Sequence, residues 1–170
     1  MDTFLAIASR REVRDYDGRP LPDEVVHRIL DAGRLSGSSA NKQQWRFVLV
    51  SGNAQARLVD AVFEPENVRG AALVVAIVVA GKGPLSFDAG RCAQNMLLAA
   101  WNDGVGGCPN GLADREAGDE IVGVAEEESI AIVLTFGYPA RPRDPESRTP
   151  EAWSARAKRK PLDDVVTRRS

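Results

Sequence analysis

Hydrophobic positions recur at helical spacing in several stretches of the chain. The spacing predicts helices over residues 2–9, 23–35, 53–63, 87–102 and 114–124. In the first of these we expect Phe4, Leu5, Ile7 and Ala8 to point inward. Pro65 is expected to end the third, because a proline ring does not fit inside a helix.

The predicted helix over residues 87–102 is apolar nearly all round in its second half, Met96–Trp101. A helix of this kind is buried on more than one side. A single domain of this length has little room for that burial. The pattern therefore favours a partner subunit that covers the second face.

Three stretches of continuous apolar residues, rich in β-branched side chains, predict strands over residues 45–50, 72–79 and 130–136. The first is too apolar for an exposed edge, so we expect it inside the sheet. Gly104–Gly111 predicts a glycine-rich turn, in which Gly104 ends the preceding helix. The strands are interrupted by helices without regular spacing, which favours a mixed α+β sheet.

The last thirty residues differ from the rest, since they hold nine of the 22 basic residues and four of the ten prolines. Such a tail is either mobile or wraps around another structure. Val165 and Val166 are suited to a short edge strand on another chain. With 170 residues, the chain is expected to form one domain over 1–170, with 140–170 as an extended arm.

Composition narrows the class of protein. A net charge of -2 disfavours an obligate polyanion binder. The longest apolar run, residues 71–80, is too short for a membrane span of ~20 residues, and Asp2 with the short run 4–8 disfavours a signal peptide. We therefore expect a cytoplasmic protein in which Cys92 and Cys108 are reduced thiols.

The chain has one histidine, His27, which falls outside the apolar stripe of the helix predicted over 23–35. We expect it to face water. A serine or cysteine nucleophile that relies on a histidine base is therefore not expected. No Cys and His spacing typical of zinc is present, so no metal site is predicted.

Three clusters carry candidate chemistry. Arg10, Arg11 and Arg14 are spaced to converge on one anion, although a solvated basic turn has the same pattern. A second cluster places short polar side chains and amides before Trp45, where they can donate and accept at the edge of a heterocycle or simply cap a turn. The third, Arg156–Lys160, precedes Pro161 and equally fits a solvated tail.

Two glycine clusters suggest a dinucleotide site only weakly. In Gly81–Ser86 the third glycine position is a serine, and Pro84 lacks the amide that would face a pyrophosphate. The second cluster, Gly104–Gly107, follows a helix where the fingerprint needs a strand. Within it, Gly106 and Gly107 would let a flat ligand approach the backbone closely.

Taken in order, the motifs RREVR, SSANKQQW, DAGRCAQNMLLAAWNDGVGG, FGYP and RKPLDDVV resemble the FMN-dependent nitroreductase family in its short form. The resemblance runs from about Phe4 to Val166. It implies a mixed, mainly antiparallel sheet flanked by helices, with a C-terminal tail that wraps the partner subunit of a homodimer. It also implies FMN as cofactor, held at the subunit interface.

The resemblance assigns contacts to particular positions of this chain. Its arginine motif implies that Arg10, Arg11 and Arg14 clasp the FMN phosphate. The polar loop implies that the flavin and its ribityl chain contact the following residues: Ser38, Ser39, Asn41 and Gln43. Backbone amides of Gly106 and Gly107 would lie near the reactive edge, and Arg159, with Lys160 beside it, would reach the phosphate.

The implied activity is transfer of hydride from NADH or NADPH, through flavin N5, to a small electron-poor acceptor such as a nitroaromatic or a quinone, by ping-pong kinetics. No catalytic side chain is expected, because the flavin carries the chemistry. Alternatives are a fold relative that dehalogenates or breaks down flavin, and a flavin-binding module without turnover. Neither nucleic acid nor a membrane is expected as a partner.

The chain departs from the family pattern in three places. Glu12 stands where a small hydroxyl residue is usual, so its carboxylate must turn away from the phosphate or pair with Arg11. Gln44 replaces a common proline before Trp45. The segment between Val50 and Ala71 is short, so we expect at most a minimal lid over the flavin.

Overall fold

The computed structural model describes residues 1–169. The chain divides into two compact units, one of residues 11–143 and one that combines residues 1–10 with residues from 144 onward. Each unit is described by itself. Ser170, the last residue of the predicted domain and arm, lies outside the described residues.

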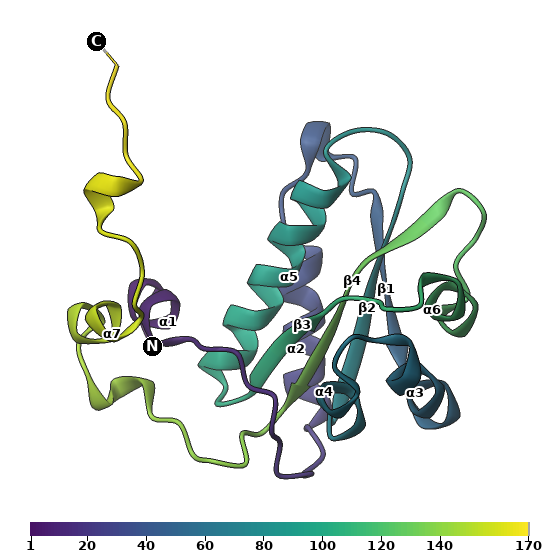
Figure 1. Ribbon diagram of the computed structural model, residues 1–170, viewed down its shortest axis with the longest axis horizontal. Coiled ribbons are helices and arrows are strands. Elements are labelled where there is room, and N and C mark those ends of the chain that lie inside the picture. Colours follow the sequence, from purple (N-terminus) through teal and green to yellow (C-terminus); the bar gives the residue numbers. More distant parts are fainter. Residues whose placement is uncertain (170) are drawn as a thin grey trace. The chain divides into compact units, whose positions relative to one another are not determined.

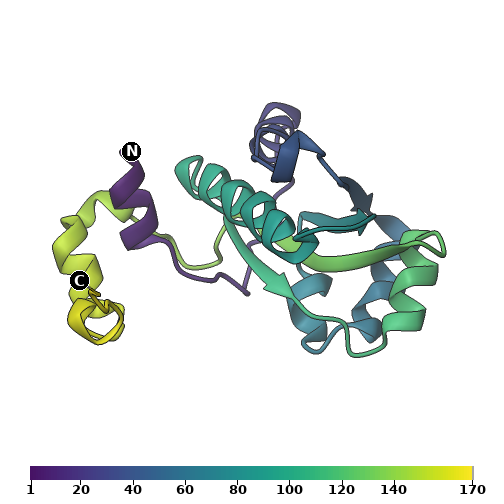
Figure 2. The same cartoon turned by 90° about the horizontal axis from the view of Figure 1, so that it is seen from above.

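In the larger unit a sheet lies between two layers of helices (Figures 1 and 2). Among the described residues its strands stand in the order β1-β2-β4-β3, and every neighbouring pair is antiparallel. The strands are β1 (Trp45–Val50), β2 (Leu73–Ala80), β3 (Gly106–Asn110) and β4 (Glu128–Gly137). The predicted α+β class with a mainly antiparallel sheet is confirmed.

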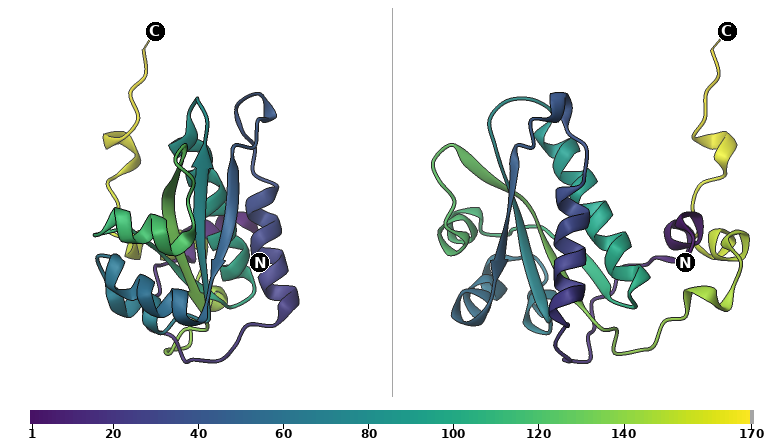
Figure 3. Two further views of the ribbon diagram at one scale, coloured as in Figure 1. Left: turned by 90° about the vertical axis from the view of Figure 1, so that its right-hand side faces the viewer. Right: turned by 180° about the vertical axis from the view of Figure 1, so that it is seen from behind.

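The helices of this unit are α2 (Asp23–Arg34), α3 (Gly52–Leu58), α4 (Pro65–Arg69), α5 (Leu85–Asn102) and α6 (Arg115–Val122), with short 3₁₀ turns at η1 (Ser39–Asn41) and η2 (Val59–Ala61). Helices α2 and α5 cover one face of the sheet, and α3, α4 and α6 cover the other, as the left view of Figure 3 shows. His27 is exposed on α2, as predicted.

Strand β2 has buried residues on both faces because helices cover both faces of the sheet. Val75 and Ile77 pack under α2 and α5, whereas Val74 and Ala76 pack under α3, α4 and α6. Alternation of side chains along a strand produces this division. A bulge opposite Ile77 and Val78 shifts the register with β4, so that Ile130 joins the second core rather than the first.

Helix α5 ends in the way its glycine predicts. Gly104 has a φ of 75° and donates its N–H to Trp101 O at 3.1 Å, while Val105 donates to Ala100 O at 2.9 Å. This pair of bonds is the Schellman motif, which satisfies the last carbonyls of a helix. The side chain of Val105 is fully buried, so the turn also directs the chain into the core.

Four local predictions were wrong. Strand β1 is an edge strand, with Leu49 50% exposed. Residues 106–110 form strand β3 rather than a turn, because β4 supplies hydrogen-bond partners that short-range patterns do not reveal. Pro65 begins helix α4, where its missing N–H costs nothing. Phe4 and Ile7 are more than half exposed on helix α1.

The smaller unit holds helix α1 (Thr3–Ser9), helix α7 (Pro150–Arg156) and the 3₁₀ turns η3 (Pro145–Ser147) and η4 (Leu162–Asp164). Helices α1 and α7 are in contact, and the indole of Trp153 donates to Pro145 O at 2.7 Å. Every described residue after Ala157 is exposed, including Leu162, Val165 and Val166. Among the helices of residues 1–169, none combines the length and hydropathy required to cross a membrane.

Candidate functional site

The polar loop that precedes β1 has an unusual backbone. Ala40, Asn41 and Gln43 have φ values of 50°, 52° and 50°, a left-handed region that costs energy for residues with a side chain. The hydroxyl of Ser38 accepts the Gln43 N–H at 2.9 Å, and the Gln43 amide donates to Asn41 Oδ1 at 3.2 Å. Clustered backbone strain of this kind is typical of ligand-binding loops.

The loop is attached to helix α5 at positions between Asp88 and Asn95. The Ser39 N–H donates to Asp88 Oδ2 at 3.3 Å, and Asn95 Nδ2 donates to Ser36 Oγ at 2.8 Å. Between these contacts the Arg91 guanidinium lies against Gly37, where it would stand 2.4 Å from an added Cβ. Asp88, Arg91 and Asn95 share one helical face, so α5 fixes the loop while Ser39, Asn41 and Gln43 remain exposed.

Two cavities, each of about 390 Å³, lie where the loop joins strand β1. Gln43, Trp45 and Arg46 line both of them. The first is completed by residues of α2 and β1: His27, Leu30, Asp31, Arg34 and Phe47. An exposed amide therefore stands beside aromatic and apolar walls, a combination suited to a flat heterocycle.

Residues 11–18, the arginine segment, lie at the opposite edge of the sheet from β1, against β3 and the end of β4. The Val13 N–H donates to Gly107 O at 3.2 Å, and the Asp17 N–H donates to Tyr138 O at 2.9 Å. Between them, the Arg14 guanidinium contacts the thiol of Cys108. This contact raises the pKa of Arg14, and the nearby carboxylates of Glu12 and Glu64 raise it further.

A cavity of about 230 Å³ lies over this segment. Its lining includes three arginines, Arg14, Arg141 and Arg143, together with the carboxylates of Glu12 and Asp15. Arg141 and Arg143 were not among the predicted site residues. The available signal was their alternation with Pro142 shortly after the strand predicted over residues 130–136, which is β4 in the structure. The hydrogen bond from Ala140 N to Asp15 O (3.0 Å) brings this stretch beside the arginine motif.

Gly106 and Gly107 are paired in β3, opposite Gly137 and Phe136. Protein side chains occupy the space that their missing Cβ atoms leave. A Cβ on Gly106 would stand 2.5 Å from the Val13 side chain, and one on Gly107 would stand 2.8 Å from Leu97 and Phe136. Close packing within the chain is thus one reason for glycine here, and the predicted flavin contact of these backbones stays a prediction.

The remaining predicted residues belong to two places. Arg11 opens the larger unit, next to the segment just described. Arg10, Arg159 and Lys160 belong to the smaller unit, where Arg10 follows α1 and the other two precede η4. Both Arg159 and Lys160 are exposed, and their predicted contact with a phosphate stays a prediction.

Within the larger unit the polar loop and the arginine segment are far apart. The turn at residues 39–41 lies at one end of the unit and residues 11–18 at the opposite end, in Figure 1 and in both views of Figure 3. Their cavities share no lining residue. A single subunit therefore does not bring the two clusters to a common cavity.

Solved structures define the class of fold. A nitroreductase family protein of Clostridium difficile 630 superimposes with a TM-score of 0.84 at 19% sequence identity, over 100% of this chain and 99% of that chain. A protein of Desulfovibrio desulfuricans assigned as a nitroreductase, solved in complex with FMN, gives a TM-score of 0.83 at 24% identity, over 100% and 98% of the two chains. These likenesses show the nitroreductase fold.

Sequence comparison places the chain more narrowly. The Nitroreductase family model matches residues 7–82 and 85–138. A protein of Archaeoglobus fulgidus assigned as an NADH dehydrogenase/NAD(P)H nitroreductase is 30% identical over 149 residues, 81% of this chain and 86% of that protein. The chain belongs to the nitroreductase family and is an oxidoreductase, which confirms the family predicted from the motifs.

Proposed function

We propose that this protein is an FMN-dependent oxidoreductase that takes hydride from NADH or NADPH and reduces small electron-poor acceptors such as nitroaromatics or quinones. Membership of the nitroreductase family supports the reaction class. The name of the Archaeoglobus relative supports a nicotinamide donor, and the FMN complex of the Desulfovibrio protein supports the cofactor. The observation that carries the proposal for this chain is the arginine-lined cavity beside β3.

The donors at that cavity fit a phosphate group. Arg14, Arg141 and Arg143 line it, and the planar fork of each guanidinium matches phosphate oxygens. Arg11 directly precedes Glu12, which also lines the cavity, and we assign Arg11 to the same phosphate together with Arg10, Arg159 and Lys160. When bound, the flavin supplies the hydride chemistry, and the chain binds and orients it.

The donors of the polar loop fit the other part of the cofactor. Ser38, Ser39, Asn41 and Gln43 offer hydroxyl and amide groups to the ribityl chain and the ring edge. Asp88 holds the loop from behind through the Ser39 N–H. The hydrogen bonds from Gln43 N to Ser38 Oγ and from Gln43 Nε2 to Asn41 Oδ1 also hold the left-handed residues in place, so these groups are preorganised for a ligand.

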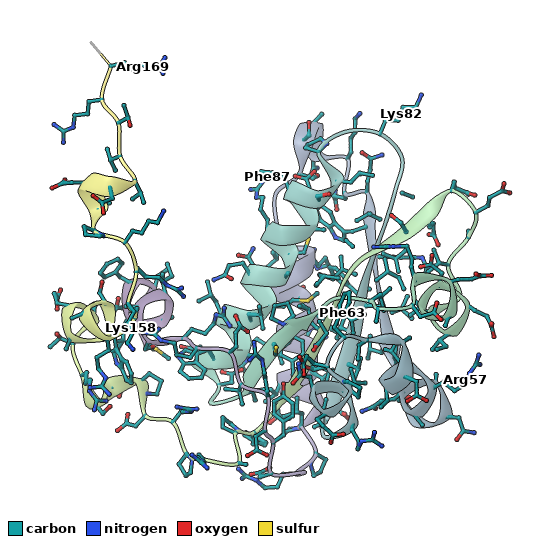
Figure 4. The ribbon with its side chains drawn as sticks, in the orientation of Figure 1. Arg57, Phe63, Lys82, Phe87, Lys158 and Arg169 are labelled. Carbon is teal, nitrogen blue, oxygen red and sulfur yellow. The ribbon has the colours of Figure 1, made fainter. Side chains whose placement is uncertain are left out.

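The separation of the two clusters supports a homodimer. One flavin meets both only if the loop of one subunit reaches the arginine cavity of the other. Phe87 on α5 is 66% exposed, and Figure 4 shows it pointing away from the sheet. Together with the exposed Leu162 and Val165 of the tail, it provides apolar surface that a second subunit would cover.

The decisive experiment is spectroscopic. Protein purified with added FMN and then desalted should be yellow with about one flavin per subunit, and should bleach with NADH or NADPH in the absence of oxygen. Arg14→Ala should bind FMN more weakly, by about 1.5–3 kcal/mol, because it removes a charge-assisted donor. Arg57→Ala is the matched control, since Arg57 lies on α3 and pairs with Glu120 at 2.7 Å.

Each other outcome removes a defined part of the proposal. Colourless protein after desalting would remove the cofactor assignment. Yellow protein that does not bleach would favour the flavin-binding module. A matrix of both donors against nitroaromatic, quinone and halogenated aromatic acceptors separates reduction from dehalogenation and identifies the preferred donor.

A further inference from the structure

Two glycines face each other beneath the arginine segment. Gly106 of β3 and Gly137 of β4 are register partners, so their missing side chains would lie on the same face of the sheet. A Cβ on Gly106 would stand 2.5 Å from Val13, and one on Gly137 would stand 2.8 Å from the ring of Tyr16. This glycine seat, Gly106 with Gly137, receives Val13 and Tyr16, which flank the pair Arg14 and Asp15 in the sequence.

From the seat, the hydroxyl of Tyr16 enters a chain of buried polar groups. It donates to Val13 O at 2.8 Å and lies 3.1 Å from Thr135 Oγ1. Thr135 Oγ1 also accepts from Asn110 Nδ2 at 3.1 Å, and Asn110 Oδ1 accepts from Asn67 Nδ2 at 2.8 Å. The chain links the Arg14 segment to β4, β3 and helix α4 in turn.

Burial gives these hydrogen bonds their importance. Thr135 is fully buried, and Asn110 and Asn67 are 4% and 6% exposed. Buried polar groups are costly unless they are paired, so each member restricts the position of the next. Burial also raises the pKa of Tyr16 well above its ordinary value, which keeps its hydroxyl protonated as the donor to Val13 O.

Arg14 lies between the two anchored residues. Its backbone is held on one side by the hydrogen bond from Val13 N to Gly107 O, and on the other by Tyr16. Its guanidinium contacts Cys108, the register partner of Thr135. A long flexible side chain held in this way loses less conformational freedom when it binds an anion.

We propose that Tyr16, Thr135 and Asn110, acting through the glycine seat, are positioning residues that hold Arg14 in the orientation required for the phosphate of FMN. This role rests on the proposed function, because it takes the phosphate as the ligand of Arg14. None of the three residues touches the ligand in this scheme. Their effect on binding passes entirely through Arg14.

The test is a double-mutant cycle on FMN affinity. Tyr16→Phe and Thr135→Val keep the shapes of the side chains and remove the hydroxyl groups. Each should weaken FMN binding about 5- to 30-fold, the equivalent of one or two hydrogen bonds. In an Arg14→Ala background the same substitutions should have almost no further effect, because the group that they position is gone.

The matched control is Tyr138→Phe, since Tyr138 is also half-buried and its ring contacts the nearby Arg19 at 4.3 Å. It should leave FMN affinity unchanged. If Tyr16→Phe and Thr135→Val weaken FMN binding by the same factor in the Arg14→Ala background as in wild type, the proposal is overturned and their effect is structural. Unchanged affinity in both hydroxyl variants would also overturn it.

Amide hydrogen exchange without FMN separates this proposal from the proposed function. The Val13 N–H should exchange faster in Tyr16→Phe and Thr135→Val than in wild type, with the protection of β2 unchanged. If wild type shows the expected exchange but binds no FMN, the proposed function is wrong and the positioning role falls with it. If wild type binds FMN but the Val13 N–H exchanges no faster in Tyr16→Phe and Thr135→Val than in wild type, only the positioning role is wrong.

Discussion

The N–H of Ser39 donates a hydrogen bond to the carboxylate of Asp88 at 3.3 Å, which attaches the polar loop to the first turns of helix α5. Asp88 is 7% exposed, so little water competes for its oxygens. The three left-handed residues that follow Ser39 make the loop costly to form by itself. This contact thus connects the conformation of the loop to the stability of the helix.

Asp88→Ala should weaken FMN binding by about 1.5–3 kcal/mol, because a hydrogen bond to a charged group is lost and the loop becomes free to relax. Asp88→Asn keeps an acceptor oxygen and should retain most of the affinity. Asp23→Ala, in the first turn of α2, is the control for a general loss of acidic charge at a helix start. Equal affinity in wild type and Asp88→Ala, measured by fluorescence titration, would disprove a role for this contact.

Glu12→Gln should strengthen FMN binding. The Glu12 carboxylate lines the arginine cavity, where it repels a phosphate and competes for Arg14. Since Glu12 is exposed, the gain should be about 0.5–1 kcal/mol and should shrink as salt is added. Glu24→Gln, on α2, should change nothing, and weaker binding in Glu12→Gln would show that the carboxylate orders the site instead of opposing the ligand.

Removal of residues 158–170 should release FMN and shift the protein from dimer to monomer. The deleted segment carries Arg159 and Lys160, assigned to the phosphate, and the exposed apolar residues Leu162, Val165 and Val166. Sedimentation velocity with detection at the flavin absorbance reports both changes. As a control, the double substitution Arg168→Ala with Arg169→Ala should leave a dimer with FMN bound. A tight dimer that still binds FMN after the truncation would contradict a wrapping tail.

The acid stability of the fold should depend on Glu128. Its two carboxylate oxygens accept from Arg46 at 2.8 and 2.5 Å, and this pairing lowers the pKa of Glu128 from 4.5 to about 2. A carboxylate with a lowered pKa stabilises the folded state above its ordinary pKa, and that contribution is lost as the pH falls toward 2. The free energy of unfolding, measured with urea between pH 5 and pH 2, should therefore fall less steeply with decreasing pH in Glu128→Gln than in wild type.

For comparison, the free energy of unfolding of Glu120→Gln should fall with decreasing pH as steeply as that of wild type. Glu120 also pairs with an arginine, Arg57, but its side chain is 72% exposed and the pair is solvated. Identical curves for Glu128→Gln and wild type would show that the Arg46 pair contributes nothing in acid.

Elements with a strong internal pattern were predicted well. The run 72–79 became β2 (Leu73–Ala80), and the stretches 23–35 and 87–102 became α2 and α5 within two residues. Strand β3 was missed because Gly106, Gly107, Cys108, Pro109 and Asn110 carry no alternating pattern. It is a strand because β4 pairs with one of its edges and Val13 donates to the other.

The types of residue at the candidate site were also visible in the sequence, since clustered arginines indicate an anion site and a polar loop indicates a site for a heterocycle. Their arrangement was not. Arg141 and Arg143 join Arg14 only because the chain that follows β4 runs beside residues 15–17. Asn67 and Asn110 look like ordinary loop residues until α4 and β3 bury them against Thr135.

The sequence by itself determined the family, the class of fold and the chemistry of the two clusters, because apolar periodicity and ordered motifs are local properties of a chain. The tertiary structure alone decided that β1 is an edge, that Gly106 and Gly137 form a seat for Val13 and Tyr16, and that the loop and the arginines lie at opposite ends of one unit. Strand pairing and burial join residues more than a hundred positions apart, such as Tyr16 and Thr135. Such pairings depend on how whole elements pack, which no short stretch of sequence encodes.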